Sequence, residues 1–295
     1  MGGDSAEREI SLNSGGAVLA ALRHSGVDAH GLDAREGVLA RLSDGGYERA
    51  FIMLHGRGGE DGVIQGALER IGLPYTGSGV LGSALGMDKY RTKALWRGLG
   101  LPTPESVLIS GSSELDEAEA LGYPLIVKPN GEGSSIGMNR VENRDQLRQA
   151  WQEAARYDAL VLAERWIAGE EYTAAILDRQ TLPLIRLETP HLFYDYQAKY
   201  ASTTTCYHCP CGLAPGQEAE LQALCLRAFD AVGASGWGRV DLMLDQQQRP
   251  WLIEVNTVPG MTDHSLVPMS AKVAGIDFPE LVLRILATSR QRGAL

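Results

Sequence analysis

Two short apolar segments near the end of the chain carry acidic side chains that could bind a metal ion. Residues 238–244 and 251–256 alternate apolar and polar side chains around a polar turn, DQQQRP, which predicts an antiparallel hairpin. A turn centred between its second and third glutamines pairs Met243 with Leu252. Because side chains alternate between the faces of a strand, one face should enter the core. That face would consist of Val240, Leu242, Leu244, Trp251, Ile253 and Val255.

The other face of the predicted hairpin carries two carboxylates directly opposite each other. The same register pairs Asp241 with Glu254 and Arg239 with Asn256. Opposed like charges destabilise a sheet by roughly 0.2–1 kcal/mol, so a face built for stability alone would avoid this pair. Two carboxylates and an amide oxygen suit Mg²⁺, whose other ligands are water and substrate phosphates. The alternative is a solvated face on which Arg239 screens both carboxylates.

A glycine-rich loop in the middle of the chain has the composition of a phosphate-binding loop. The strand expected at 123–127 leads into Lys128 and then into NGEGSSIG at 130–137. Glycines and the adjacent Ser134 and Ser135 can present backbone N–H groups to phosphate, and a lysine can reach it as a flexible point charge. The loop lacks the Walker A pattern. An ordinary glycine-rich hairpin is the alternative.

The segment after the next predicted strand, 160–163, could bind a nucleoside. Residues 164–167 (ERWI) combine a carboxylate, backbone groups and an apolar wall, which suits an adenine ring and a ribose. Glu164 and Glu171 both lie beyond the end of that strand. Surface carboxylates without a ligand are the alternative interpretation.

Two polar residues in the first third of the chain are candidates for binding a substrate. Residues 50–54 (AFIML) predict a short strand, and His55 opens the loop HGRGGEDG at its C-terminal end, where open α/β sheets bind ligands. A structural role for His55 is an equal alternative. Glu7 opens the first predicted helix, and its spacing from Asp4 also suits a capping box.

Composition narrows the class of protein. The 295 residues suffice for two or three domains, and the net charge of −10 argues against a basic nucleic-acid interface. We expect no membrane span and no signal peptide, because no apolar run is long enough. Four cysteines are too few for a disulfide scaffold and fit a reducing cytoplasm. Cys206, Cys209 and Cys211 flank His208, but the second ligand pair of a usual zinc site is missing.

The order of predicted elements indicates an α/β protein of three units. Strand, helix and glycine loop alternate in the first unit, 1–88, as in a doubly wound domain. The second unit covers 89–171, and the third, 172–295, contains the hairpin. The segment 191–210 lacks periodicity but is rich in aromatic residues, which predicts an ordered lid. Helices are expected at 63–71, 90–99, 113–121, 144–156, 217–232 and 278–286, and further strands at 106–109, 172–177 and 182–188.

Taken together, these motifs make the chain similar to the D-alanine–D-alanine ligases of the ATP-grasp superfamily. The likeness runs from Gly2 to about Ser289 through GGDSAEREISLNSG, LHGRGGEDG, YTGSG, MDKYRTK, VKPNGEGSSIGM, FYDYQAKY, GWGRVDLML and LIEVNTVPGMTDHSLVP. The resemblance implies a three-domain ATP-grasp architecture with a Rossmann-like N-terminal domain. It also implies that ATP drives the ligation of two D-alanines to D-alanyl-D-alanine, through an acyl phosphate, for peptidoglycan synthesis.

The resemblance further implies the cofactors and partners. These are ATP and two Mg²⁺ ions, for which Mn²⁺ can substitute, and D-alanine as the substrate. It implies a cytoplasmic homodimer that binds neither nucleic acid nor a membrane.

For the nucleotide, the resemblance implies three groups of residues. The phosphates would contact Lys89, Lys128, Ser135 and Lys199. Adenosine would contact Glu164, Arg165, Trp166, Ile167, Glu171 and Phe193. The metal ligands would be Asp241, Glu254 and Asn256.

For the amino acids, the resemblance implies a second set of roles. Glu7 would hold the ammonium group of the first D-alanine, with His55 nearby. The remaining residues would bind the oxyanion (Arg239 and the Gly260 N–H), close the lid (Ser134 and Tyr200) and hold the second D-alanine (Ser265 and Leu266). A tyrosine at position 200 goes with D-alanine, and not D-lactate, as the second substrate.

The chain departs from the family pattern in three places. Members begin with a short apolar strand before the two glycines, whereas Met1 here directly precedes Gly2. We therefore expect a truncated or misassigned start, which would affect the position of Glu7 and the stability of the first domain. Arg165 stands where a lysine is common, and backbone contacts should survive this change. The pair Cys206 and Cys209 at the end of the lid has no derived role.

Two other functions are compatible with the residues. One is a different ATP-grasp carboxylate–amine ligase, which takes a hydroxy acid or another amino acid as its second substrate. The other is a nucleotide-binding protein without catalytic activity.

Overall fold

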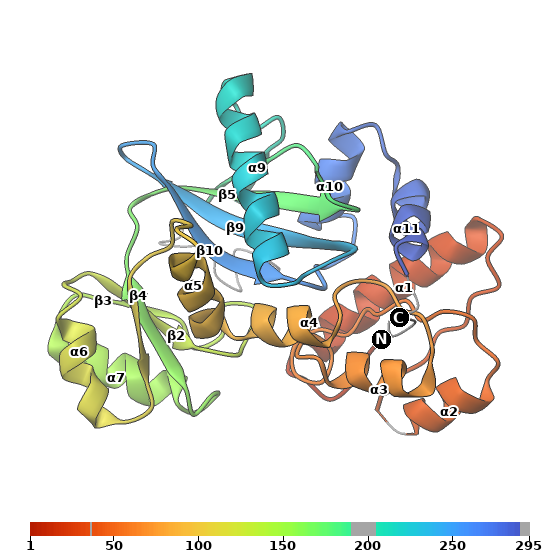
Figure 1. Ribbon diagram of the computed structural model, residues 1–295, viewed down its shortest axis with the longest axis horizontal. Helices are drawn as coiled ribbons and strands as arrows, with labels where there is room; N and C mark the ends of the chain where they lie inside the picture. Colours follow the sequence, from red (N-terminus) through yellow and green to blue (C-terminus); the bar gives the residue numbers. More distant parts are fainter. Residues whose placement is uncertain (36, 190–204, 290–295) are drawn as a thin grey trace.

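Three α/β units lie in a row in the computed structural model, which describes residues 1–35, 37–189 and 205–289 (Figure 1). The N-terminal unit forms one end of the elongated molecule, and a small sheet with its helices forms the other. A larger sheet lies between and above them. None of the helices in these described ranges is both long and apolar enough to cross a membrane.

The elements follow the chain in the predicted order. The N-terminal unit contains α1 (Arg8–His24), α2 (Val38–Asp44), α3 (Val63–Ile71) and α4 (Val80–Met87), and α5 (Lys89–Gly98) follows. The central unit contains β1 (Ser106–Ile109), η1 (Ser112–Glu114), α6 (Leu115–Glu119), β2 (Leu125–Pro129), β3 (Asn139–Val141), α7 (Arg144–Ala154) and β4 (Val161–Arg165). The C-terminal unit contains β5 (Gly169–Leu177), β6 (Gln180–Thr181), β7 (Ile185–Glu188), β8 (Cys206–His208), α9 (Pro215–Ala231), β9 (Trp237–Asp245), β10 (Pro250–Asn256), α10 (Leu266–Val273) and α11 (Phe278–Ala287).

Helix α4 is the main element that the sequence pattern missed. Its sequence, VLGSALGM, contains Gly82 and Gly86, and each glycine lowers helix propensity by about 1 kcal/mol relative to alanine. The structure shows why at least one glycine is needed. A Cβ atom on Gly82 would lie 2.5 Å from the backbone oxygen of Gly233, so α4 packs directly against the backbone of the C-terminal unit.

The central sheet has the antiparallel order β1-β4-β2-β3, and α6 and α7 lie against it (Figure 1). Leu147, Ala150 and Ala154 of α7 are buried in the core that this layer shares with the sheet. Strand β2 is buried along its whole length. It therefore delivers Lys128 and the glycine-rich loop from a fixed position in the sheet.

The larger sheet has the order β10-β9-β5-β7-β8, with α9 packed on one face (Figure 1). Cys225 and Phe229 of α9 belong to its core. Trp96 of α5 enters the same core fully buried, and its indole N–H donates a 3.0 Å hydrogen bond to the carbonyl of Ala228. Helix α5 is thereby fixed to this sheet, although it precedes the central unit in the sequence.

The hairpin β9–β10 confirms the two pairs that matter for the site and corrects a third. Asp241 pairs with Glu254 and Arg239 with Asn256, as predicted. Met243 pairs with Trp251, and not with Leu252, because a β-bulge interrupts the register between Leu252 and Glu254. The bulge also changes the predicted core face.

Leu252 is fully buried at the bulge, whereas Trp251 and Ile253 are only partly buried. The side chain of Ile253 lines the pocket beside Glu254. The bulge thus moves one apolar residue out of the core and onto the ligand side of the hairpin, which is a common use of bulges near functional sites.

The strand predicted at 50–54 is not formed as a strand. A single parallel bridge joins Ala50 to Tyr75, and the backbone N–H of Ala50 donates to the Pro74 carbonyl at 2.8 Å. Ile52 and Met53 are nevertheless buried in a core shared with α1, α3 and the C-terminal α11. The segment therefore has the predicted burial but lacks a full set of strand partners.

A cavity of about 560 Å³ borders this segment. Residues 49–54 and 27–32 both line it, together with apolar side chains of α1 and α3. Met1 also lines the cavity, and its backbone pairs with residues 32–34 as a strand would. Its ammonium group donates to the Leu32 carbonyl at 3.1 Å, and its carbonyl accepts from the N–H of Ala34 at 3.0 Å.

An apolar extension of five alternating valine and isoleucine residues placed before Met1 should stabilise the protein. The extension would run along the cavity from Met1, and each side chain that becomes fully buried contributes about 1.5–3 kcal/mol. It would also turn the buried ammonium group of Met1, whose pKa burial lowers to about 6, into an uncharged amide. Because roughly 1 kcal/mol moves the melting temperature of a protein of this size by about 2–4 °C, a rise of at least 5 °C is expected.

Differential scanning fluorimetry of the extended and original chains measures this effect. An extension of equal length made of serine and asparagine is the control, since it also removes the buried ammonium group. Equal melting temperatures for the two extended chains would show that the cavity does not accept a strand.

Candidate nucleotide and amino-acid site

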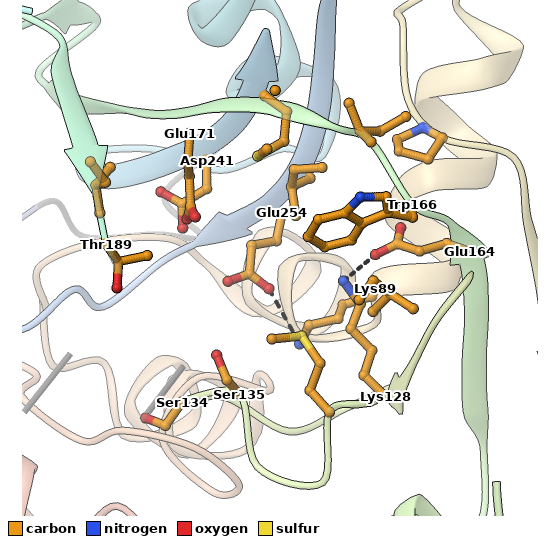
Figure 2. Close-up of a pocket in the computed structure, with 18 of the residues that line it drawn as sticks. Lys89, Lys128, Ser134, Ser135, Glu164, Trp166, Glu171, Thr189, Asp241 and Glu254 are labelled. Atoms are coloured by element: carbon orange, nitrogen blue, oxygen red, sulfur yellow. Dashed lines mark ion pairs between the residues drawn. The ribbon is translucent and has the colours of Figure 1, made fainter. Parts of the chain in front are cut away.

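A pocket of about 440 Å³ lies between the central sheet and the larger sheet. This volume is typical of a small-molecule site. Carboxylates of the larger sheet face the glycine-rich loop across the pocket, and lysines and Trp166 close its inner side. The lining residues labelled in Figure 2 include Lys89, Lys128, Ser134, Ser135, Glu164, Trp166, Glu171, Asp241 and Glu254.

A buried row of three charges lies at the inner side of the pocket, and two of them, Glu164 and Lys128, line it. Glu164 of β4 makes ion pairs with Lys128 of β2 and, at 2.9 Å, with Lys93 of α5. All three side chains are less than 10 % exposed. Burial raises the pKa of the Glu164 carboxyl, but the two ammonium groups outweigh this effect and lower its pKa to about 2.

The pKa values of the two lysines in this row shift in opposite directions. Burial lowers the pKa of Lys93 to about 8, and the Glu164 charge only partly compensates. Burial also acts to lower the pKa of Lys128, but Glu164 and Glu254 reverse the effect, so its pKa is raised. Lys128 therefore stays a cation at the pocket surface. Because the carboxylate of Glu164 is engaged by lysines, its predicted contact with adenosine stays a prediction.

Residues 165–167 supply an apolar wall and a backbone edge. The ring of Trp166 lines the pocket and stacks under the guanidinium of Arg140, 5.3 Å from its centroid. The side chain of Arg165 lies 3.4 Å from Glu105, and its backbone N–H donates to the Glu105 carbonyl. The contact of this backbone with adenosine stays a prediction. Ile167 lines the same pocket.

The hairpin brings together the oxygen atoms that were predicted to bind a metal ion. Asp241 accepts two hydrogen bonds from Arg239, at 2.7 and 2.8 Å, and one from Thr173 at 2.6 Å. Glu254 lies 3.6 Å from Lys89. The side-chain oxygen of Asn256 is buried and has no hydrogen-bond partner among the described residues. A buried oxygen without a partner, on the same hairpin as two carboxylates, suits a hard cation.

The glycine-rich loop connects the pocket to the N-terminal unit. The hydroxyl of Ser134 donates a hydrogen bond to Glu7, which precedes α1. Ser134 and Ser135 adopt the left-handed conformation, with φ of 54° and 57°, which is uncommon outside glycine. Residues held in this region cluster at ligand sites. The structure therefore joins two stretches that are 127 residues apart in the sequence.

His55 is buried beside this junction, and the hydroxyl of Ser5 donates to its carbonyl at 2.7 Å. Burial lowers the pKa of its imidazole to about 4, so the ring is neutral at physiological pH. Its Nε2 atom has no hydrogen-bond partner among the described residues. A neutral ring with one open nitrogen is suited to binding a polar group of a ligand.

Glu60 is a site residue that the sequence analysis did not select. Its carboxylate accepts a 2.7 Å hydrogen bond from the Gly56 N–H. Burial and the nearby charge of Glu7 raise its pKa to about 8. The loop sequence HGRGGEDG supplies the carboxylate but gives no signal of its protonation, because Glu7 becomes its neighbour only on folding.

Gly260 and Ser265 lie together at the start of α10. A Cβ atom on Gly260 would be only 3.0 Å from the Ser265 hydroxyl, which also accepts a 2.9 Å hydrogen bond from the Thr262 N–H. The side chain of Leu266 packs in a core with Ile185 and Leu187. Any contact of Leu266 with a substrate must therefore come from its backbone.

Some predicted residues cannot be placed. Phe193, Lys199 and Tyr200 lie outside the described residues. Within the described part of the chain, no cluster of three histidine, cysteine or acidic residues could hold a metal ion. Cys206 and Cys209 are both free thiols.

Comparison with known proteins places the chain among one group of enzymes. Residues 95–287 match a family model described as the C-terminus of D-ala D-ala ligase. A D-alanine–D-alanine ligase of Nitrosococcus oceani is 63% identical over 293 residues, which cover 99% of this chain and 93% of the relative.

Solved structures show the same likeness. A D-alanine–D-alanine ligase from Bacillus anthracis aligns with a TM-score of 0.88 at 35% identity, covering 98% of this chain and 95% of the relative. Its complex with ATP aligns with a TM-score of 0.85 at 34% identity, covering 98% and 94%. The VanG D-Ala:D-Ser ligase from Enterococcus faecalis aligns with a TM-score of 0.84 at 29% identity, covering 98% and 97%.

The substitution Glu60→Gln should change how stability depends on pH. An acid whose folded pKa is raised, here from 4.5 to about 8, holds its proton more tightly in the folded state. The stability that protonated Glu60 contributes is fully present below about pH 4.5 and is lost as pH rises toward 8. The wild-type melting temperature should therefore fall more between pH 5 and 8 than that of E60Q.

Thermal melts at half-unit pH steps measure this difference. The buried ammonium group of Met1 makes stability rise with pH, but it does so in both proteins, so its effect cancels in the comparison. Glu220→Gln on the exposed surface of α9 is the matched control. Parallel profiles for wild type and E60Q would contradict the raised pKa.

Proposed function

The chain belongs to the D-alanine–D-alanine ligase family of ATP-grasp enzymes, and from this premise we propose that it joins two D-alanines at the expense of ATP. The observation that supports this most directly is the junction of two sites. The pocket with Lys128, Trp166 and the hairpin carboxylates meets the pair formed by Glu7 and Ser134. A nucleotide in the first and an amino acid at the second would adjoin each other.

The reaction needs two steps. A carboxylate oxygen of the first D-alanine attacks the γ-phosphorus, the bond to the bridging oxygen breaks, and ADP leaves. The amine of the second D-alanine then attacks the carbonyl of the acyl phosphate, loses a proton, and expels inorganic phosphate. Phosphoryl transfer of this type depends on positioning and charge neutralisation more than on covalent catalysis.

The cations of the pocket would neutralise the phosphates. Lys128 is kept protonated by Glu164, and Lys89 lies between Glu254 and the loop, where it donates a 2.6 Å hydrogen bond to the Glu132 carbonyl. Ser135 lines the pocket beside them. Trp166 and Ile167 would form the wall against adenine, and Glu171, at the edge of the same pocket, would reach the ribose.

Asp241, Glu254 and Asn256 would hold Mg²⁺ or Mn²⁺, because the two carboxylates lie opposite each other in the hairpin and the Asn256 oxygen has no partner among the described residues. When bound, such ions neutralise phosphate charge and align the transferred group. Lys89 lies 3.6 Å from Glu254, so phosphate and cation would each meet one member of this pair. Two ions remain the expectation.

The amino acids would bind on the side of the N-terminal unit. Glu7 would accept the ammonium group of the first D-alanine, with neutral His55 beside it. The guanidinium of Arg239 gives two of its five N–H groups to Asp241, and we assign it, together with the Gly260 N–H, to the tetrahedral oxyanion. Ser265 and the Leu266 backbone, at the N-terminus of α10, would bind the second carboxylate.

Three further parts of the proposal rest on the resemblance. Phe193, Lys199 and Tyr200 would belong to a lid that closes over the pocket. The enzyme would act in the cytoplasm and as a homodimer. The second substrate is the least constrained feature, because a D-Ala:D-Ser ligase is among the structurally similar proteins.

Phosphate release from ATP and Mg²⁺ tests the proposed reaction and its specificity. D-alanine alone should give phosphate and D-alanyl-D-alanine in equal amounts, whereas L-alanine should give neither. Mixtures of D-alanine with D-serine or D-lactate, analysed by mass spectrometry, should still yield mainly the dipeptide of D-alanine. Nucleotide binding without release would favour a catalytically inactive protein, and a mixed product would favour the alternative ligase.

Replacing Glu254 by glutamine should lower kcat by a factor of about 100 to 1,000, in the range seen when one stabilising group is removed from a transition state. The neutral amide keeps the shape of the side chain but not its charge, so higher Mg²⁺ should restore only part of the rate. Steady-state phosphate release over a series of Mg²⁺ concentrations measures this. Glu220→Gln should leave kcat and its dependence on Mg²⁺ unchanged. An unchanged kcat in E254Q would show that this carboxylate does not belong to the site.

A further inference from the structure

Lys93 is a fully buried lysine to which the proposed mechanism gives no role. It lies on α5 one turn after Lys89, so the two side chains leave the same face of the helix. Its ammonium group has three neighbours from three other segments. These are the Glu164 carboxylate at 2.9 Å, the Thr103 hydroxyl at 3.1 Å and the Leu252 carbonyl at 3.3 Å.

One of these contacts leads to the phosphate side of the pocket. Glu164 uses one carboxylate oxygen for Lys93 and the other for Lys128. The position of the Lys128 ammonium group is therefore set by a carboxylate that Lys93 holds from behind. Without Lys93, Glu164 would be a buried anion with one cationic partner, and it would draw Lys128 inward.

The other contacts lead to the metal side. The Leu252 carbonyl accepts hydrogen bonds from Lys93 and, at 2.8 Å, from the Thr103 hydroxyl, and its N–H donates to the Pro102 carbonyl at 2.8 Å. Leu252 is the residue at which the register of β10 shifts before Glu254. The bulge that directs Glu254 into the pocket is thus held on its outer edge by α5 and the segment that follows it.

We propose that Lys93 is a positioning residue that fixes the phosphate-binding Lys128 and the cation-binding Glu254 relative to each other. This inference rests on the proposed function, because it assumes that phosphate and a divalent cation bind at those two groups. Lys93 does not line the pocket and would not contact the nucleotide. It acts through Glu164 on one side and through the Leu252 carbonyl on the other.

The choice of lysine fits this role. An ammonium group has three donors, and the structure offers one charged and two neutral acceptors around it. The charged groups that face it from the packed elements are Glu164, Lys128 and Glu254. A neutral side chain would leave the Glu164 carboxylate of the central unit and the Leu252 carbonyl of the C-terminal unit without the partner that they share.

The test uses the full chain with Lys93→Met, Lys93→Arg and Thr103→Val, and Lys272→Met as the control on the exposed face of α10. ADP is the probe, and its dissociation constant is measured by calorimetry with and without Mg²⁺. KM values for ATP and D-alanine are measured alongside, and thermal melts show that each variant is folded.

K93M should weaken Mg²⁺-free ADP binding at least tenfold and raise the KM for ATP similarly, with the KM for D-alanine within twofold of wild type. K93R, which keeps the charge, should recover Mg²⁺-free ADP binding to within threefold. T103V should leave Mg²⁺-free binding unchanged but raise at least threefold the Mg²⁺ concentration needed to tighten ADP. K272M should behave as wild type.

A folded K93M that binds ADP like wild type would overturn the proposal. If K93M does not fold, Lys93→Gln takes its place. T103V tests the link to Glu254 independently, because an unchanged Mg²⁺ dependence of ADP binding in T103V would refute that link. A wild type that binds ADP but releases no phosphate with D-alanine would refute the proposed function while leaving the test of Lys93 readable.

Discussion

The pocket depends on one electrostatic constraint, a carboxylate buried between two ammonium groups. Removing three charges from water is expensive, and only close mutual contact offsets the cost. Because Lys93, Glu164 and Lys128 come from α5, β4 and β2, the constraint fixes these three elements at one distance from each other. The ionised state of Glu164 and the cationic state of Lys128 follow from it, and the lysine side of the pocket is built on that result.

The hairpin shows how far a period-two argument can reach. The pairing of Asp241 with Glu254 was predicted correctly, although the turn is one residue tighter than assumed and the bulge before Glu254 adds that residue back. The two deviations cancel at the end that carries Asp241 and Glu254 and not at the turn end, where Trp251 takes the place of Leu252 opposite Met243. Alternation of apolar residues cannot reveal a bulge, because the bulge is decided by contacts with Pro102 and Thr103, far away in the sequence.

Other features were beyond sequence reasoning for the same physical reason. The glycine-rich loop, the hairpin and the resemblance identified the family and most of the pocket, since each is a local pattern. Lys93 looked like any helix lysine, and its value comes from burial by three other segments. The strand at 50–54 was predicted from its apolar run, but strand formation needs partners on its edges, and a cavity borders one of them. The raised pKa of Glu60 likewise depends on Glu7, which folding brings beside it.

The shared core of the N-terminal unit and α11 determines how the molecule can move. Residues of α1 and α3 pack in one cluster with Val267, Leu281 and Ile285, and Arg49 donates hydrogen bonds to Ser289. The core of the central sheet, in contrast, contains only residues between Val107 and Ala163. The N-terminal unit and α11 thus share one core, whereas the central unit has a core of its own. Opening of the pocket would have to break the buried contact of Lys93 with Glu164, which holds the central sheet to α5.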